Sequence, residues 1–146
     1  MQLLAGRGQI RQASGFVIID ETYNSNPEAL KKTLQWVDGE YRQKKAAVLG
    51  DMLELGADEL AFHFEAGRFF SGLRFDLLLA VGLRAAKIAE GARQAGYPAA
   101  RIKCFDQAVD AGKYLRAELQ PGAVVLFKGS RGMALEKAIA EFVHEK

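Results

Sequence analysis

Short apolar segments alternate with segments of helical periodicity along the whole chain of 146 residues. Four of the apolar segments consist mainly of aliphatic and aromatic residues, as expected of strands that are buried on both faces. Strands that alternate with helices in this way are typical of a mostly parallel sheet with helices on both faces. We therefore expect one Rossmann-like α/β domain over residues 1–146. The predicted strands are 16–19, 45–50, 75–82, 101–105 and 123–127.

The segment 9–20 predicts an antiparallel hairpin at the N-terminal edge of the sheet, because Ser14-Gly15 supplies a turn before an apolar run. Asn26 is a favourable N-cap for the first helix, and Asp106 is expected to cap the fourth. Gly96 is placed as the stop of the third helix. The predicted helices are 27–37, 58–72, 83–97, 107–119 and 134–145.

The composition argues against several classes of protein. A formal net charge of +2, without a run of Lys and Arg, gives no electrostatic footprint for nucleic acid. Cys104 is the single cysteine, so no internal disulfide can form, and it is expected to fill the core. No secretory signal and no long apolar span is visible, so we expect a cytoplasmic protein without membrane insertion.

Open α/β sheets bind ligands at the carboxyl ends of their strands, so the residues after each strand are the candidates for a site. Three of these turns are rich in polar residues and glycine. They are DETYNSNP at 20–27, GDMLELG at 50–56 and KGSRG at 128–132. All three are expected to lie along the same edge of the sheet.

Each turn has a functional and a structural interpretation. In DETYNSNP, a carboxylate could bind ribose hydroxyls and the amides could bind a base edge or a phosphate, or the residues could simply form a capped turn. In GDMLELG, Asp51 could hold a cation or an amine, or be a solvated acid in a tight loop. KGSRG lacks the spacing of a nucleotide P-loop. It is either an anion site that uses Ser130 and Arg131 or a turn with two solvated cations.

The sequence carries no complete catalytic set and no Cys/His cluster with metal-ligand spacing, so we assign neither catalytic residues nor a metal site. His63 lies in the middle of a predicted helix. A lone helical histidine is more often a packed structural residue than a catalytic base, and this is the interpretation that we favour.

Four segments, DETYNSNPEAL, AVLGDMLELG, HFEAG and VLFKGSRGMALEK, occur in the order and spacing of one bacterial protein family. Together they resemble the C-terminal domain of the Mur ligases. The resemblance extends from Gly6-Arg7 to the last helix, and GDMLELG and KGSRGM resemble the ligases that add D-alanyl-D-alanine. It implies that an N-terminal UDP-sugar domain and a central ATPase domain are absent from this chain.

The resemblance also implies a reaction of peptidoglycan synthesis. The full-length enzyme is expected to join D-alanyl-D-alanine to UDP-N-acetylmuramoyl tripeptide, using ATP and Mg²⁺ that are bound mainly by the absent central domain. The peptide carboxylate is phosphorylated, the amine of the dipeptide attacks the acyl phosphate, and phosphate leaves. The partners of this chain are then its own preceding domains, ATP or ADP and the two substrates. The isolated domain is expected to be inactive.

Carried over residue by residue, the resemblance implies two groups of site residues. The residues expected at the nucleotide are Arg7, Glu21, Tyr23, Asn24 and Asn26. The residues expected at the dipeptide are Asp51, Lys128, Ser130 and Arg131. Glu21 stands where the family usually has Asp, and Ser25 where it commonly has Ala.

An alternative is a non-catalytic module of the same fold. A receiver-like domain needs an acidic cluster at the strand ends with a phosphorylatable aspartate, for which Asp20 and Asp51 are suitably placed, and a lysine after the last strand, which Lys128 could supply. A nucleotide-binding module that works alone is a third possibility. The receiver-like interpretation leaves DETYNSNP and the hairpin without a use.

Overall fold

The computed structural model describes residues 2–3 and 8–144. This part of the chain forms strands and α-helices joined by loops, with 3-10 helices in some connections. The strands are β1 (Gln2–Leu3), β2 (Gln9–Ala13), β3 (Phe16–Glu21), β4 (Lys45–Gly50), β5 (Leu77–Val81), β6 (Ile102–Phe105) and β7 (Val124–Lys128). The α-helices are α1 (Pro27–Glu40), α2 (Glu59–Ser71), α3 (Ala86–Gln94), α4 (Ala108–Glu118) and α5 (Glu136–Phe142). The 3-10 helices are η1 (Gly56–Asp58), η2 (Ala99–Arg101) and η3 (Arg131–Met133).

The strands form one seven-stranded sheet in the order β1-β2-β3-β7-β4-β5-β6. β1, β2 and β3 are joined antiparallel, whereas β3, β7, β4, β5 and β6 run parallel to one another. This confirms the predicted mostly parallel sheet with an antiparallel hairpin, to which β1 adds a short edge strand that was not predicted. Ser14 and Gly15 have φ of 54° and 85°, the left-handed pair that a type I′ hairpin turn requires.

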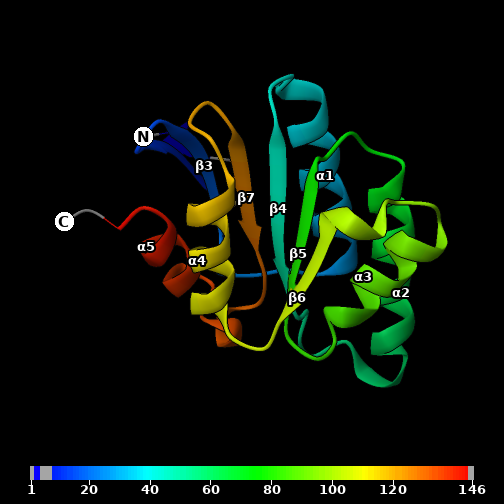
Figure 1. Cartoon of the computed structure of the whole chain (residues 1–146). Helices are drawn as coiled ribbons and strands as arrows, with labels where there is room; N and C mark the ends of the chain where they lie inside the picture. The colour runs from blue at the N-terminus through cyan, green and yellow to red at the C-terminus, as the bar shows by residue number, and fades with distance from the viewer. Residues whose placement is uncertain (1, 4–7, 145–146) are drawn as a thin grey trace.

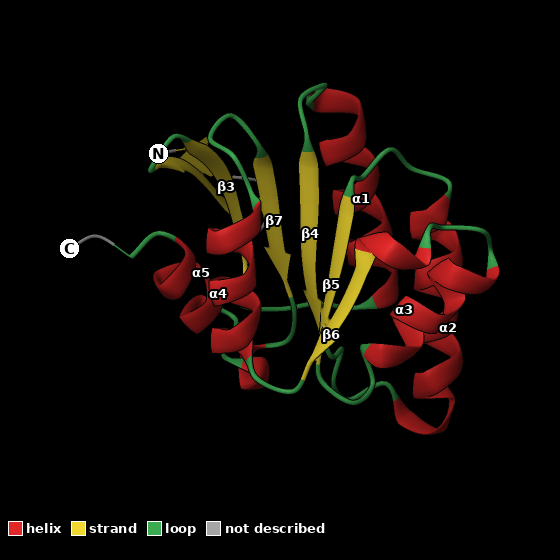
Figure 2. Ribbon diagram, in the orientation of Figure 1, coloured by secondary structure: helices red, strands yellow, loops and turns green. Residues whose placement is uncertain are grey.

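Helices cover both faces of the sheet (Figure 1 and Figure 2). α1, α2 and α3 pack on one face, and α4 and α5 pack on the other. Because successive residues of a strand point to opposite faces, Ala47 and Leu49 of β4 contact the first layer of helices. Ala46 and Val48 contact the second layer. This division explains why the strand segments are apolar at nearly every position.

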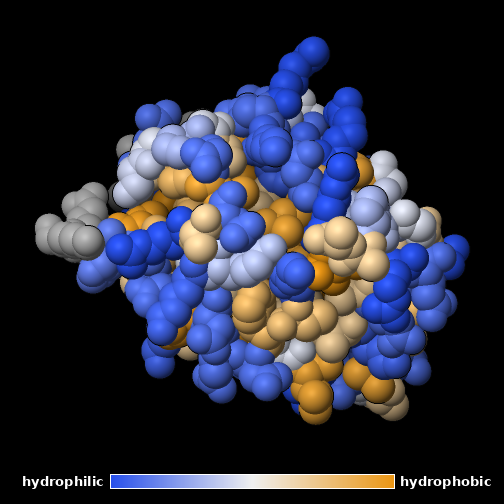
Figure 3. Space-filling model, in the orientation of Figure 1, coloured by the Kyte–Doolittle hydropathy of each residue, from blue (hydrophilic) through white to orange (hydrophobic). Residues whose placement is uncertain are grey.

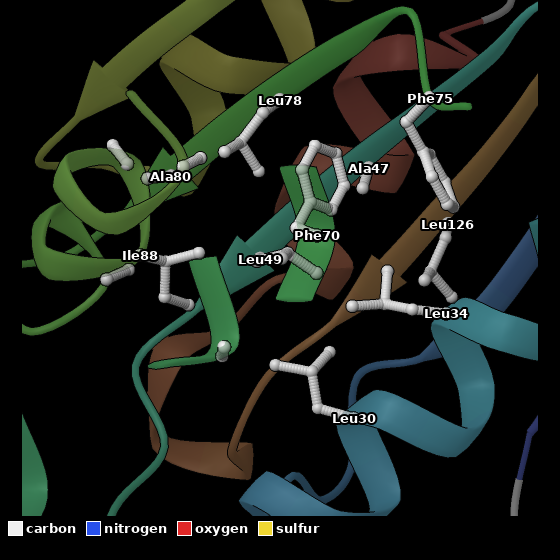
Figure 4. Packing of buried hydrophobic residues seen from close by; sticks show 14 of the residues in the cluster. Leu30, Leu34, Ala47, Leu49, Phe70, Phe75, Leu78, Ala80, Ile88 and Leu126 are labelled. Atoms are coloured by element: carbon white, nitrogen blue, oxygen red, sulfur yellow. The ribbon is translucent and has the colours of Figure 1, made fainter. Parts of the chain in front are cut away.

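The core between the sheet and α1–α3 is built around aromatic side chains. Figure 4 shows Leu34 of α1 and Phe70 of α2 pointing toward the strands, with Leu126 of β7 nearby. The ring of Phe70 lies 5.0 Å from that of Phe75 and 5.2 Å from that of Tyr97, measured between centroids. The hydroxyl of Tyr97 donates to the carbonyl of Phe75 at 2.9 Å, so its buried polar end is satisfied.

Glycines allow α2 and α3 to approach each other closely. A Cβ atom added to Gly67 would lie 1.9 Å from the carbonyl oxygen of Ile88, and one added to Gly91 would lie 2.0 Å from that of Phe64. Both glycines are buried at this contact. The absence of side chains at these two positions therefore sets the distance between the helices.

The helix boundaries agree with those predicted from the sequence at some ends and differ from them at others. Asn26 caps α1 as predicted, since its Oδ1 accepts from the N–H of Ala29 at 2.9 Å. The predicted cap at Asp106 is wrong, because α4 has Gln107 at the N-cap position, without a side-chain cap bond. The last helix is shorter than predicted, because η3 and the left-handed residue Ala134, with φ of 55°, precede it.

The surface of the molecule is mixed. On the face drawn in Figure 3, hydrophilic side chains lie around the rim and apolar side chains gather toward the centre. Cys104 lies in the edge strand β6 and is exposed, so the prediction that it fills the core is wrong. No helix within the described ranges is long and apolar enough to span a bilayer.

β7 is the last strand in the sequence, yet it lies between β3 and β4. β3 and β4 lead into α1 and α2 on one face of the sheet, whereas β7 leads into α5 on the other face. Neighbouring strands whose connections leave toward opposite faces open a crevice at their carboxyl ends. Such a crevice is expected on each side of β7, between β3 and β7 and between β7 and β4, at the lower edge of the sheet in Figure 1.

Candidate functional site

The three polar turns that were predicted to form a site follow β3, β4 and β7, which are adjacent strands. The N–H of Gly129 donates to the carbonyl of Glu21 at 3.4 Å, and the N–H of Ser130 donates to the carbonyl of Asp51 at 3.1 Å. The turn 128–132 is therefore hydrogen-bonded to a neighbouring turn on each side. The predicted site residues meet at this edge, except that Arg7 lies outside the described residues.

Glu21 and Lys128 form a buried ion pair between the ends of β3 and β7. Nζ of Lys128 lies 2.6 Å from Oε1 of Glu21, and the two side chains are 5% and 11% exposed, respectively. The hydroxyl of Thr33 donates to the same oxygen at 2.9 Å, and Lys128 also donates to the carbonyl of Asn24 at 3.2 Å. The residue assigned to the nucleotide and the residue assigned to the dipeptide thus contact each other.

Local hydrogen bonds hold the turn after β3. Thr22 donates from its N–H and its hydroxyl to Oδ1 of Asp20, at 3.1 and 2.8 Å. The side-chain oxygen of Asn26 is occupied as the cap of α1, which matches the structural interpretation of this residue. The side chains of Tyr23 and Asn24 are exposed, and neither makes a hydrogen bond to another described residue. They are the side chains of this turn that are open to a ligand.

Asp51 is buried at the end of β4, and both of its carboxylate oxygens have partners. Oδ1 accepts from the N–H of Ala85 at 2.7 Å, and Oδ2 accepts from the guanidinium of Arg84 at 3.2 Å. Arg84 also binds Glu59 at 2.7 Å, and the hydrogen bonds to Glu59 and then Asp51 raise its pKa above the ordinary value. A Cβ atom on Gly82 would lie 2.4 Å from Oδ1 of Asp51, so the turn after β5 fits closely against this carboxylate.

This geometry gives no support to the receiver-like alternative. Asp51 is 3% exposed and fully paired, so its carboxylate is not presented for phosphorylation. Lys128, at the end of β7, binds Glu21 at the end of β3 and not Asp51 after β4.

The loop after β4 is held by two side chains from other elements. The N–H of Leu53 donates to Oγ of Ser130 at 2.9 Å, and the N–H of Met52 donates to Nε2 of His63 at 2.9 Å. Because Nε2 accepts, the ring proton is on Nδ1, which lies 2.6 Å from the carbonyl of Glu59 and donates to it. His63 is fully buried. The structural role favoured for this histidine is confirmed.

Arg131 is the exposed cation of the turn after β7. Its guanidinium carbon lies 4.8 Å from the centre of the Tyr23 ring. No hydrogen bond or ion pair links its side chain to another residue within the described ranges. Arg131 and Tyr23 line a hollow of about 510 Å³ together with Asp20, Thr22 and Glu136. Unlike Lys128, Arg131 thus has its donors free for an anionic group.

Arg84, Glu59 and Thr33 also take part in this edge of the sheet, although no sequence pattern predicted them. Arg84 follows the third parallel strand, so its place after a strand was the one signal available. Glu59 and Thr33 lie in helices, and their side chains bond to Arg84 and Glu21, which are 25 and 12 positions away in the sequence. No local pattern indicates such contacts.

Comparison with known proteins gives a consistent result. The family profile described as "Mur ligase, glutamate ligase domain" matches residues 6–131. The UDP-N-acetylmuramoyl-tripeptide–D-alanyl-D-alanine ligase of Bacillus subtilis is 36% identical over 135 residues, which are 92% of this chain and 29% of that protein. The corresponding ligase of Escherichia coli is 29% identical over 130 residues.

Crystal structures of MurF proteins share this fold. The structure from Acinetobacter baumannii superposes with a TM-score of 0.82 at 30% identity, covering 94% of this chain and 30% of that chain. The structure from Thermotoga maritima, a complex with ADP, gives 0.78 at 29% identity and covers 97% and 31%. The chain thus spans about a third of the length of these relatives. It belongs to the Mur ligase family, as a C-terminal domain.

Proposed function

We propose that this chain is the dipeptide-positioning domain of the ATP-dependent ligase that adds D-alanyl-D-alanine to UDP-N-acetylmuramoyl tripeptide in the bacterial cytoplasm. The matched relatives carry this activity in their names, which supports the choice of substrate. The structural observation that carries the proposal is the position of Arg131. Its guanidinium has no carboxylate partner among the described residues and lies beside a hollow at the carboxyl edge of the sheet.

Arg131 and Ser130 are the proposed ligands of the dipeptide carboxylate. A guanidinium can donate two parallel hydrogen bonds to one carboxylate, and this geometry fixes the orientation of the ligand. Oγ of Ser130 accepts from Leu53, so its own O–H remains able to donate. Once the carboxylate is held, the amine at the other end of the dipeptide has a defined direction. Positioning of the amine is the contribution to catalysis that this domain makes.

For Asp51 and Lys128 we propose an indirect part in the same site. Asp51 joins the turns after β4 and β5, and Lys128 joins the turns after β3 and β7. Both side chains are almost completely buried. They keep the turn that carries Ser130 and Arg131 in place through these contacts.

The nucleotide is proposed to meet the turn after β3, through Tyr23, Asn24 and Glu21, with Arg7 and Asn26 beside them. The Thermotoga maritima relative was crystallised with ADP, which supports a nucleotide in the parent enzyme. Both bonds to Glu21 go to Oε1, so Oε2 has no partner among the described residues and suits a ribose hydroxyl. Asn24 offers a free amide at the surface.

The residues present do not fit a Mg²⁺ site. No group of three His, Cys, Asp or Glu side chains within the described ranges could hold a metal ion. We propose that the metal, the γ-phosphate and the UDP-sugar are bound by N-terminal and central domains that precede this one in the full-length protein. Those domains are then its permanent partners.

The proposed function is tested by the product of the full-length ligase. The enzyme is incubated with ATP, Mg²⁺ and UDP-N-acetylmuramoyl tripeptide, and the amine is D-alanyl-D-alanine, D-alanine, D-glutamate or L-lysine. Mass spectrometry is expected to detect a new amide only with the dipeptide. A product formed with a single amino acid in preference to the dipeptide would refute the proposal.

A further inference from the structure

We propose that Tyr23 is a positioning residue for Arg131, and so acts on the dipeptide although its turn is assigned to the nucleotide. This inference rests on the proposed function, in which Arg131 binds the dipeptide carboxylate. The guanidinium carbon of Arg131 lies 4.8 Å from the centre of the Tyr23 ring, within the range of a cation–π contact. The contact joins the turn after β3 to the turn after β7.

The contact with Tyr23 orients the guanidinium without using its hydrogen bonds. An ion pair with a carboxylate would occupy part of the N–H donors of Arg131 and offset its charge, as the ion pair with Glu21 does for the ammonium of Lys128. An aromatic face attracts the charge of the guanidinium and leaves those N–H groups free. A long exposed side chain that is held in this way loses less conformational entropy when a ligand binds.

Tyr23 is suited to this role because the backbone on both sides of it is fixed. Thr22 is bonded to Asp20 through its N–H and its hydroxyl, and the carbonyl of Asn24 accepts from Lys128. Tyr23 is nevertheless 55% exposed, so burial does not account for the position of its ring. A rigid turn thus presents an aromatic face to a cation at the rim of the hollow.

Arg131 is supported at the backbone in the same manner. Ser130, the residue before it, is bonded to Asp51 and Leu53, and the carbonyl of Arg131 accepts from Ala134 at 3.2 Å. The backbone of Arg131 is therefore fixed, while its side chain extends into the hollow. The Tyr23 ring lies against the guanidinium and can therefore direct it.

The test is steady-state kinetics of the full-length ligase with D-alanyl-D-alanine and ATP varied separately. Tyr23→Leu removes the aromatic face, and we expect the KM for the dipeptide to rise about two- to fivefold, by a larger factor than the KM for ATP. Tyr23→Phe keeps the face and is expected to behave as wild type. In an Arg131→Ala background, Tyr23→Leu is expected to have no further effect on the dipeptide, because the cation it orients is gone.

Tyr114→Leu is the matched control. It removes another tyrosine that lies under a cation, with Nζ of Lys103 6.0 Å from the ring centre, away from the three turns. Both KM values are expected to stay at the wild-type level, and thermal melting checks that each variant is folded. An NMR spectrum of this chain provides a second readout. The Hε resonance of Arg131 is expected to move on Tyr23→Leu, because it loses the ring current.

The outcomes separate the inference from the proposed function. If Arg131→Ala raises the KM for the dipeptide but Tyr23→Leu does not, the inference is wrong and the proposed function stands. A rise confined to the KM for ATP in Tyr23→Leu also overturns the inference and returns Tyr23 to the nucleotide. If Arg131→Ala leaves the dipeptide kinetics unchanged, the proposed function fails and the inference fails with it.

Discussion

Nζ of Lys128 and Oε1 of Glu21 lie 2.6 Å apart, and the two residues are register partners at the ends of two parallel strands. The pair is buried and is completed by the hydroxyl of Thr33 and the carbonyl of Asn24. It connects the two turns that carry the proposed nucleotide and dipeptide ligands. Its first role is therefore to hold the crevice together.

Removal of one partner of this pair leaves a buried charge without compensation. We expect Lys128→Met to lower the free energy of unfolding by about 2–3 kcal/mol in urea titrations monitored by circular dichroism. The double variant Glu21→Gln/Lys128→Met should be more stable than Lys128→Met, because no uncompensated carboxylate remains. Equal stability of Lys128→Met and wild type would mean that the pair is solvated.

Asp38 is expected to make stability depend on pH in the acid range. Burial would raise the pKa of this carboxyl, but the N–H of Arg74 and the ammonium of Lys45 outweigh it, so the pKa lies below the ordinary value of 3.8. The unfolded chain therefore binds a proton at a higher pH than the folded one. The stabilisation by Asp38 is complete above the unfolded pKa and is lost as the pH falls through the folded pKa.

The corresponding measurement is the free energy of unfolding of wild type and Asp38→Asn as the pH falls from 6 through the window below about 4. Wild type should lose stability more steeply than the variant in that window. The Nζ of Lys45 lies 3.3 Å from Asp38, so the variant should also be less stable near neutral pH. Parallel curves for the two proteins would show that the native pKa of Asp38 is not lowered.

Gly67→Ala is expected to be strongly destabilising for a helix substitution, because the new Cβ would lie 1.9 Å from the carbonyl of Ile88. The helices α2 and α3 must separate to admit it, at a cost of about 1–3 kcal/mol. Gly39→Ala is the matched control, since Gly39 lies in α1 and has no neighbour within 4 Å of an added Cβ. Alanine there should raise the free energy of unfolding by up to about 1 kcal/mol. The same change in melting temperature for both variants would contradict the close approach.

ADP is expected to bind this chain weakly, with a dissociation constant of about 1 mM, because only one side of the proposed site is present. In an NMR titration the amide signals of residues 21–26 should shift, with Asn24 among the largest changes. Residues such as Gly96 and Arg101, at the opposite edge of the sheet, serve as the internal control. Shifts confined to that edge would place the nucleotide elsewhere.

Much of the fold could be predicted, because periodicity and turn residues are local properties of the sequence. The alternation of strands and helices, the Ser14-Gly15 turn and the Asn26 cap all follow from neighbours within a few residues. The order of the strands could not be predicted in this way. β7 inserts between β3 and β4 through contacts between residues about a hundred positions apart, such as Glu21 and Lys128.

The same limit applies to the candidate site. Turns after the strands were predicted to lie on one edge, and three of them do so. The residue types, however, could not reveal that Lys128 and Asp51 are paired inside the protein while Arg131 is not. Which cation remains free depends on which carboxylate the strand order brings beside it, and that is a property of the tertiary structure.

The proposed binding of the dipeptide carboxylate by Arg131 is tested by changing the enzyme and the substrate together. Full-length wild type, Arg131→Ala and the control Lys137→Ala, which removes an exposed cation nearby, are assayed with D-alanyl-D-alanine and with its C-terminal amide. Wild type and Lys137→Ala should prefer the carboxylate by about ten- to a hundredfold in kcat/KM. Arg131→Ala should lose most of this preference, with kcat/KM for the amide and for ATP nearly unchanged. If Arg131→Ala prefers the carboxylate as strongly as wild type does, Arg131 does not bind that group and the proposed function of this turn is wrong.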